Sequence, residues 1–73
     1  MKLYYYTDTD SLYIDLADRP GVDAREVLPG VVLDLDETGA LVGIDIDHAS
    51  RQLDLWATGT TTIPIHVVGG SAE

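Results

Sequence analysis

The sequence has no cysteine and no phenylalanine, and only four of its 73 residues are lysine or arginine. Without cysteine the chain can form no disulfide framework, thiolate metal site or redox dithiol. This fits a reducing compartment, so we expect a cytoplasmic protein. Its apolar runs fall far short of the ~18 residues of a membrane span, and residues 1–3 do not open the apolar stretch of a signal peptide. We therefore expect neither a membrane protein nor a small disulfide-stapled scaffold.

The shortage of basic residues sets the charge of the molecule. Thirteen acidic residues against four basic ones give a formal net charge of −9. Contacts to phosphates need clustered lysine or arginine, so we expect no direct binding to nucleic acid. The same negative field would attract a basic protein partner and speed its association, although the charge could also serve solubility alone. The basic side chains are scattered along the chain, at Lys2, Arg19, Arg25 and Arg51.

The chain is long enough for one small domain, which we place at residues 1–68, followed by a disordered tail at 69–73. For a chain this short, the free energy gained by burying apolar surface is about offset by the entropy lost on ordering the residues. We therefore expect self-association, as a homodimer or a higher even oligomer.

Two hairpins account for most of the predicted strands. Residues 2–7 are rich in aromatic and β-branched side chains, residues 8–11 are turn formers, and residues 12–16 alternate apolar and polar. After a break at Pro20 and Gly21, residues 22–28 form a short edge strand or an extended connection. The second hairpin joins residues 31–35 to 41–47 through the turn 36–39.

The register of the second hairpin follows from its alternation. A loop with an even number of residues places its apolar residues on one face, whereas a slip by one residue would bury carboxylates. Gly43 then lies on the polar face, where the missing side chain permits close approach or a bulge. The shared apolar face consists of Val31, Leu33, Leu35, Val42, Ile44 and Ile46, and the opposite acidic face of Asp34, Asp36, Asp45 and Asp47.

The spacing of the apolar residues changes after residue 47, from alternation to a helical period. Ala49, Leu53 and Trp56 have helical spacing, which predicts a helix at about 48–57, with Asp47 or Ser50 as its N-cap and Trp56 as its anchor on the sheet. Residues 60–68 are strongly β-prone, and Pro64 restricts them to an edge. The expected fold is α+β but mainly β: a small antiparallel meander sheet of two hairpins, one short C-terminal helix and a final edge strand.

No residue pattern indicates an enzyme. His48 and His66 have no serine or cysteine nucleophile signature around them, and the glycines lack phosphate-loop spacing. The acidic face could bind Ca²⁺ or Mg²⁺ through oxygen, but alternation on a one-sided sheet produces a solvated acidic face without any ligand. We therefore expect no catalytic residues, cofactor or metal.

Exposed aromatic and aliphatic side chains are the other candidates for function. Tyrosine is enriched where one end of the ring is apolar and the other wet, as at protein interfaces, although ordinary strand packing also uses it. One helix cannot cover a five-stranded sheet, so a second copy could cover the rest. The candidate interaction residues are Tyr4, Tyr6, Tyr13, Trp56, Ile63 and Ile65.

Short motifs in a fixed order resemble those of the small bacterial family DUF2283. They lie at residues 6–14, 30–36, 39–46 and 49–50, and the resemblance covers a core of about residues 4–50. The family pattern has a Tyr-Asp turn, an Ala-Leu-Tyr-Ile-like strand, an Asp-x-Asp-x-x-Gly hairpin and a Gly-Ile-Glu-Ile strand. Here Thr7 stands where the family often has Asp, and Asp45 where Glu is usual.

The resemblance implies no catalytic residues, because the family is of unknown function. Some of its members sit beside small toxin-like proteins, which implies an antitoxin or another neutralising partner. The sequence and the resemblance thus indicate a non-enzymatic, acidic protein-interaction domain, with an antitoxin-like neutralising role as its more specific form. The alternatives are a self-associating assembly module and, less favoured, a regulator that binds a divalent metal.

Overall fold

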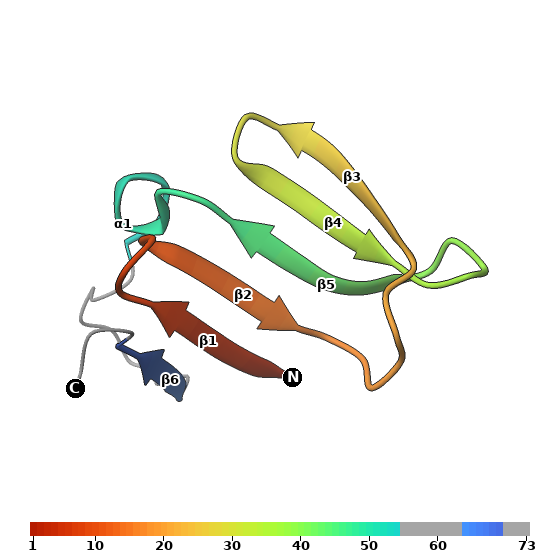
Figure 1. The fold of residues 1–73 in the computed structure, drawn as a ribbon, viewed down its shortest axis with the longest axis horizontal. Coiled ribbons are helices and arrows are strands. Elements are labelled where there is room, and N and C mark those ends of the chain that lie inside the picture. Colours follow the sequence, from red (N-terminus) through yellow and green to blue (C-terminus); the bar gives the residue numbers. More distant parts are fainter. Residues whose placement is uncertain (55–63, 70–73) are drawn as a thin grey trace.

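The computed structural model describes residues 1–54 and 64–69, which form one six-stranded sheet and one short helix (Figure 1). The predicted class, mainly β with a single short helix, is confirmed. The strands lie in the spatial order β3-β4-β5-β2-β1-β6. No helix in these two described ranges is long and apolar enough to cross a membrane. The elements are β1 (Lys2–Tyr6), β2 (Ser11–Asp15), β3 (Asp23–Leu28), β4 (Val31–Leu35), β5 (Leu41–Ile46), α1 (Ala49–Gln52) and β6 (Ile65–Val68).

The last strand differs from the predicted antiparallel sheet, because β6 pairs with β1 in parallel. A parallel neighbour requires the chain to cross back over the length of the sheet, which takes about a dozen residues. Twelve residues, 53–64, separate α1 from β6 in the sequence. The sheet is therefore mixed, while the predicted edge position of the last strand is confirmed. Pro64 lies just before β6, outside the ladder, as its missing amide requires.

Both predicted hairpins are present, and in the second the apolar residues of the two strands share one face, as predicted. Val31 lies opposite Ile46, and Leu33 lies opposite Ile44. The loop differs from the prediction, since it spans the five residues 36–40, and a register shift between Asp34 and Leu35 sets Leu35 opposite Leu41. The irregularity absorbs the extra loop residue, so the apolar pairs stay on one face. The predicted edge strand at 22–28 is also observed, as β3.

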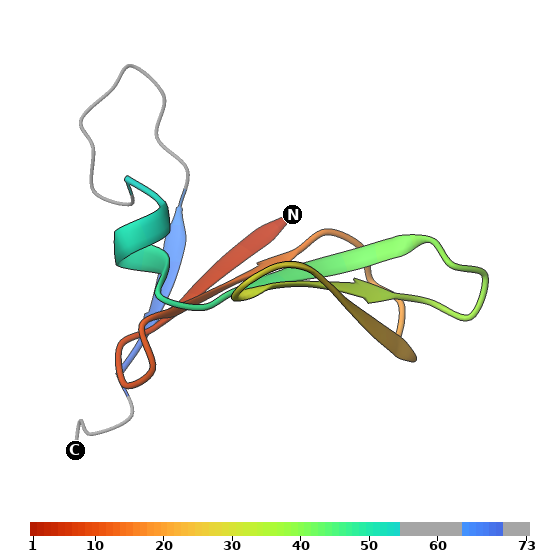
Figure 2. The same ribbon diagram turned by 90° about the horizontal axis from the view of Figure 1, so that it is seen from above.

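The core lies at the end of the sheet that α1 covers. Its buried side chains are Leu12, Ile46 and Ala49, which are 2%, 8% and 0% exposed. Figure 2 shows α1 beside one end of the sheet and the β4–β5 loop at the far end. Partly buried apolar side chains surround this cluster: Leu3, Tyr5, Ile14, Val31, Ile44 and Ile65.

The helix is shorter than predicted. It spans four residues, and Leu53 already has extended backbone angles (φ −127°, ψ 152°). Neither Asp47 nor Ser50 is the N-cap; His48 occupies that position in the left-handed region (φ 53°), with no side-chain capping bond. Residues 55–57 of the predicted helix, with Trp56, lie outside the described residues, as do Ile63 and residues 70–73 of the expected tail.

We expect Leu12→Ala to lower the free energy of unfolding by about 2–4 kcal/mol, because it leaves a cavity in the core. Leu28→Ala is the matched control, since Leu28 is 61% exposed, and it should change stability by less than about 0.5 kcal/mol. Urea unfolding followed by circular dichroism measures both. Equal effects of the two substitutions would contradict this assignment of the core.

Candidate functional site

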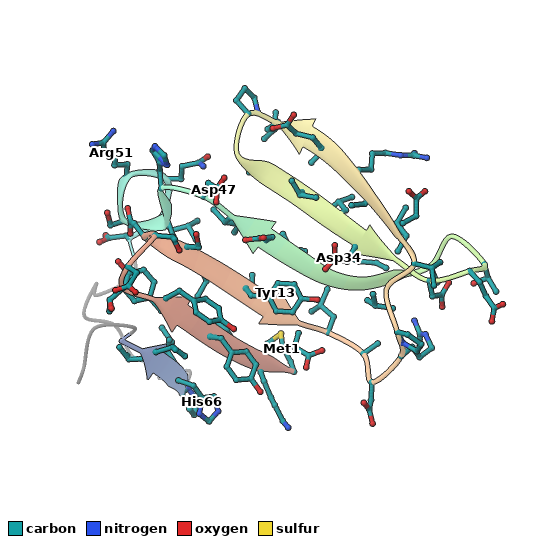
Figure 3. The ribbon with its side chains drawn as sticks, viewed as in Figure 1. Met1, Tyr13, Asp34, Asp47, Arg51 and His66 are labelled. Atoms are coloured by element: carbon teal, nitrogen blue, oxygen red, sulfur yellow. The ribbon has the colours of Figure 1, made fainter. Side chains whose placement is uncertain are left out.

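The polar face of the sheet brings together residues from five strands. Five residues, one from each of these strands, form a row across the sheet, in which each residue lies opposite the next. In order from β4 to β6 they are Val32, Asp45, Tyr13, Tyr4 and His66. The rings of Tyr4 and His66 stack, with centroids 5.1 Å apart and an interplanar angle of 25°. Tyr13, Tyr4 and His66 therefore form an aromatic strip beside the carboxylates of β4 and β5 (Figure 3).

Tyr13 lies across Gly43 to reach Asp34. Its hydroxyl donates a hydrogen bond of 3.0 Å to Oδ2 of Asp34. A side chain at position 43 would collide with Oη and Cζ of Tyr13, so only glycine leaves room for the ring. The predicted close approach at Gly43 is thus confirmed. Burial and then the hydrogen bond to the Asp34 carboxylate raise the pKa of Tyr13 to about 12.

Asp45 occupies the centre of the negative charge on this face. Burial raises its pKa, and the nearby negative charges of Asp47 and Asp34 raise it further. The one ion pair among residues 1–54 and 64–69 joins Arg19 to Asp36, away from Asp45. At neutral pH the carboxylates around Asp45 therefore repel one another without a basic partner from the described part of the chain.

Asp36, the fourth member of the predicted acidic face, has a different role. It lies in the β4–β5 loop, where its Oδ1 accepts hydrogen bonds from the amides of Thr38 and Ala40, and its Oδ2 lies 2.8 Å from Nε of Arg19. Hydrogen bonds, first from the Thr38 hydroxyl and then from the Ala40 amide, lower the pKa of Asp36 to about 2. Asp36 therefore shapes the loop.

Asp47 lies just beyond β5 and accepts a hydrogen bond of 3.3 Å from Ser11. The four aspartates thus do not converge on one point. Within the described part of the chain, no group of three or more His, Cys, Asp or Glu side chains is arranged to hold a metal ion.

A second polar junction, which sequence reasoning missed, is centred on Asp10. Its Oδ1 accepts hydrogen bonds from the Tyr5 hydroxyl (2.6 Å) and the Ser50 amide (3.1 Å), and its Oδ2 accepts one from the Ser50 hydroxyl (2.7 Å). The Asp10 carbonyl also accepts a hydrogen bond of 2.8 Å from the Ala49 amide. The hydrogen bonds from Tyr5 and Ser50 lower the pKa of Asp10. Asp10 therefore joins the β1–β2 turn to the start of α1, 40 residues further on.

The structure separates the candidate interaction residues. Tyr4 and Tyr13 share the polar face with Tyr6, which is 39% exposed. Ile65 packs against the core on the opposite face. Trp56 and Ile63 lie outside the described residues. The tyrosines therefore belong with the carboxylates of the polar face, whereas Ile65 belongs with the core.

We expect the pKa of Tyr13 to fall below about 12 in Asp34→Asn, because the substitution removes the negative charge and leaves only a neutral amide oxygen as the hydrogen-bond acceptor. It should stay above 10.0, since burial, the larger cause, remains. Carbon-13 NMR of the tyrosine ring Cζ during an alkaline titration measures this, and Asp8→Asn is the control. An unchanged pKa in Asp34→Asn would exclude the Tyr13–Asp34 bond in solution.

Asp45 and Asp36 should affect stability in opposite directions at pH 7. The folded-state pKa of Asp45 is raised, so its ionised form destabilises the fold, and Asp45→Asn should raise the Tm by a few degrees at low salt.

The pKa of Asp36 is lowered from 3.8 to about 2, so the stabilisation that ionised Asp36 contributes exists above pH 3.8 and disappears as the pH falls toward 2. Asp36→Asn should therefore lower the Tm. Differential scanning calorimetry measures both, and shifts of equal sign would contradict the assignment.

Searches of the curated proteins and of the solved structures found no match. One family model does match, that of the protein of unknown function DUF2283, over residues 2–50. The match runs from the start of β1 to Ser50 and so includes Asp10 and its partners Tyr5, Ala49 and Ser50. It covers more than half of the chain, and the protein belongs to the DUF2283 family.

Proposed function

We propose that this chain is a non-enzymatic protein-interaction domain that binds a basic protein partner through the polar face of its sheet. The observation that carries the proposal is the uncompensated negative charge around Asp45, whose pKa is raised in part by Asp47 and Asp34. A cationic side chain placed there would remove the repulsion. The binding energy would then include relief of an unfavourable interaction in the free protein.

The aromatic strip beside the carboxylates supports a protein ligand over a bare cation. Tyr13 and the stacked Tyr4–His66 pair offer ring faces next to the negative charge. Lysine and arginine combine a charged end with an apolar stem, and both can pack against aromatic rings. A divalent metal would instead need converging oxygen ligands.

A neutralising role, such as that of an antitoxin, is the more specific form of this proposal. The net charge of −9 would attract a small basic protein from a distance, and the polar face would cover its basic surface on contact. The resemblance to DUF2283 motivates the toxin-like partner, and the cytoplasm is the compartment that we propose for both proteins.

A self-associating assembly module is the second candidate function. The observation that favours it is the small core, since only Leu12, Val42, Ile46 and Ala49 are buried among the described hydrophobic residues. Many apolar side chains of the sheet remain partly exposed, and a second copy would bury more of them.

Binding of a lysine-rich peptide tests the role of the polar face. We expect Asp45→Asn/Asp47→Asn to weaken binding roughly fivefold to tenfold at low salt, because two carboxylates of that face are lost. The control Asp8→Asn/Asp18→Asn changes the net charge equally, from −9 to −7, at exposed sites outside the row. Isothermal titration calorimetry measures both.

If the two double variants weaken peptide binding equally, the effect comes from net charge alone, and the polar face is not the binding site. Absence of binding to the wild-type protein at low salt would reject the basic partner altogether. Salt should weaken binding in proportion to the number of ion pairs formed. The protein that co-purifies at low salt from the source cells then identifies the partner.

A further inference from the structure

The outer edge of β3 has no neighbouring strand within residues 1–54 and 64–69. β3 is the end strand of the sheet, with β4 as its only neighbour among the described strands, and all six of its residues are exposed (Figure 1). An edge strand presents unpaired backbone groups that can pair with another strand. We infer that two copies of this chain pair through β3, antiparallel about a two-fold axis at Ala24, and so join their sheets into one.

The symmetry limits the possible registers. A two-fold axis perpendicular to the sheet makes the paired edge strands antiparallel and keeps each face of one sheet continuous with the same face of the other. The axis must then pass beside one residue, which faces its own copy. Asp23 and Arg25 point to the same face, since they lie opposite Leu35 and Leu33 of β4.

The charges of β3 select one of these registers. With the axis at Ala24, Asp23 of each copy lies opposite Arg25 of the other, which gives two ion pairs. With the axis at Arg25 or at Glu26, like charges face each other, and like charges directly opposite destabilise a sheet. The small side chain of Ala24 also lets the two backbones approach at the axis.

The hydrogen bonds of the free strand agree with this register. The Ala24 amide donates a hydrogen bond of 2.9 Å to Oδ1 of Asp23, the preceding residue on the same strand. In the dimer this amide would donate to the Ala24 carbonyl of the second copy, and the Asp23 carboxylate would turn to the second copy's Arg25. Both groups thus exchange one partner for another on association.

The pairing ends where β3 becomes irregular. A register shift between Glu26 and Leu28 bends the end of the strand, which confines the pairing to residues 22–26. The polar face around Asp45 is not used. The dimer therefore does not depend on the proposed binding of a basic partner, and either could be wrong without the other.

Sedimentation equilibrium of the full chain tests the inference, with Arg25→Asp as the main variant. We expect the wild-type protein to have twice the mass of one chain at high micromolar concentration. Arg25→Asp sets Asp23 against a second carboxylate and should raise the dimer dissociation constant about tenfold to thirtyfold. The matched control is Arg51→Asp, which changes the net charge equally but lies on α1, and it should remain a dimer.

Two further variants test the register. The charge swap Asp23→Arg/Arg25→Asp restores opposite charges across the axis and should restore the dimer. Ala24→Pro removes the amide that the pairing requires and should yield folded monomers, because an edge strand tolerates proline where its amide faces outward. A monomeric wild-type protein, equal loss of dimer in Arg25→Asp and Arg51→Asp, or a charge swap that stays monomeric would each overturn the inference.

Discussion

Period-two alternation, held in register by antiparallel pairing, is the constraint on which the rest of this structure depends. It sets Leu12, Ile44 and Ile46 on one face of the sheet and Tyr13 and Asp45 on the other. Because the pairs Val31–Ile46 and Leu33–Ile44 must stay together, an irregularity near Leu35 absorbs the extra residue of the β4–β5 loop. The same alternation gathers the carboxylates, so the core and the candidate interaction face have a single origin.

At one end of the sheet α1 covers the apolar face, and a single polar residue, Asp10, holds α1 there through its carboxylate and its backbone carbonyl. Asp10 accepts hydrogen bonds from Ser50 and from the backbone amide of Ala49. These bonds hold the completely buried Ala49 against the core. A helix of four residues is not stable by itself, so α1 depends on this tertiary contact. That the family match ends at Ser50 is consistent with the junction as the boundary of the shared fold.

The polar face combines stabilising and destabilising interactions. Tyr13, held over Gly43, gives Asp34 a hydrogen-bond donor, whereas burial, and then the negative charges of Asp47 and Asp34, disfavour the ionised form of Asp45. An arrangement that stability alone does not favour suggests a ligand of opposite charge. The proposed partner would bind here, while the inferred dimer uses the edge at β3. The two associations could therefore occur together, and a dimer would present two copies of the polar face.

The sequence by itself determined the class of the fold, both hairpins, the shared face of the apolar residues in the second hairpin, and the room for a close approach at Gly43, because these follow from local turn chemistry and period-two patterning. It also assigned the edge position of β6, and it offered an edge strand as one of two alternatives for β3. Only the tertiary structure decided that β6 runs parallel to β1, that α1 ends at Gln52, and that Asp36 serves the loop while Asp10 reaches Ser50. The physical reason is that a local pattern specifies which face a side chain occupies, whereas a hydrogen bond across 40 residues and the direction of a returning strand depend on the packing of the whole chain.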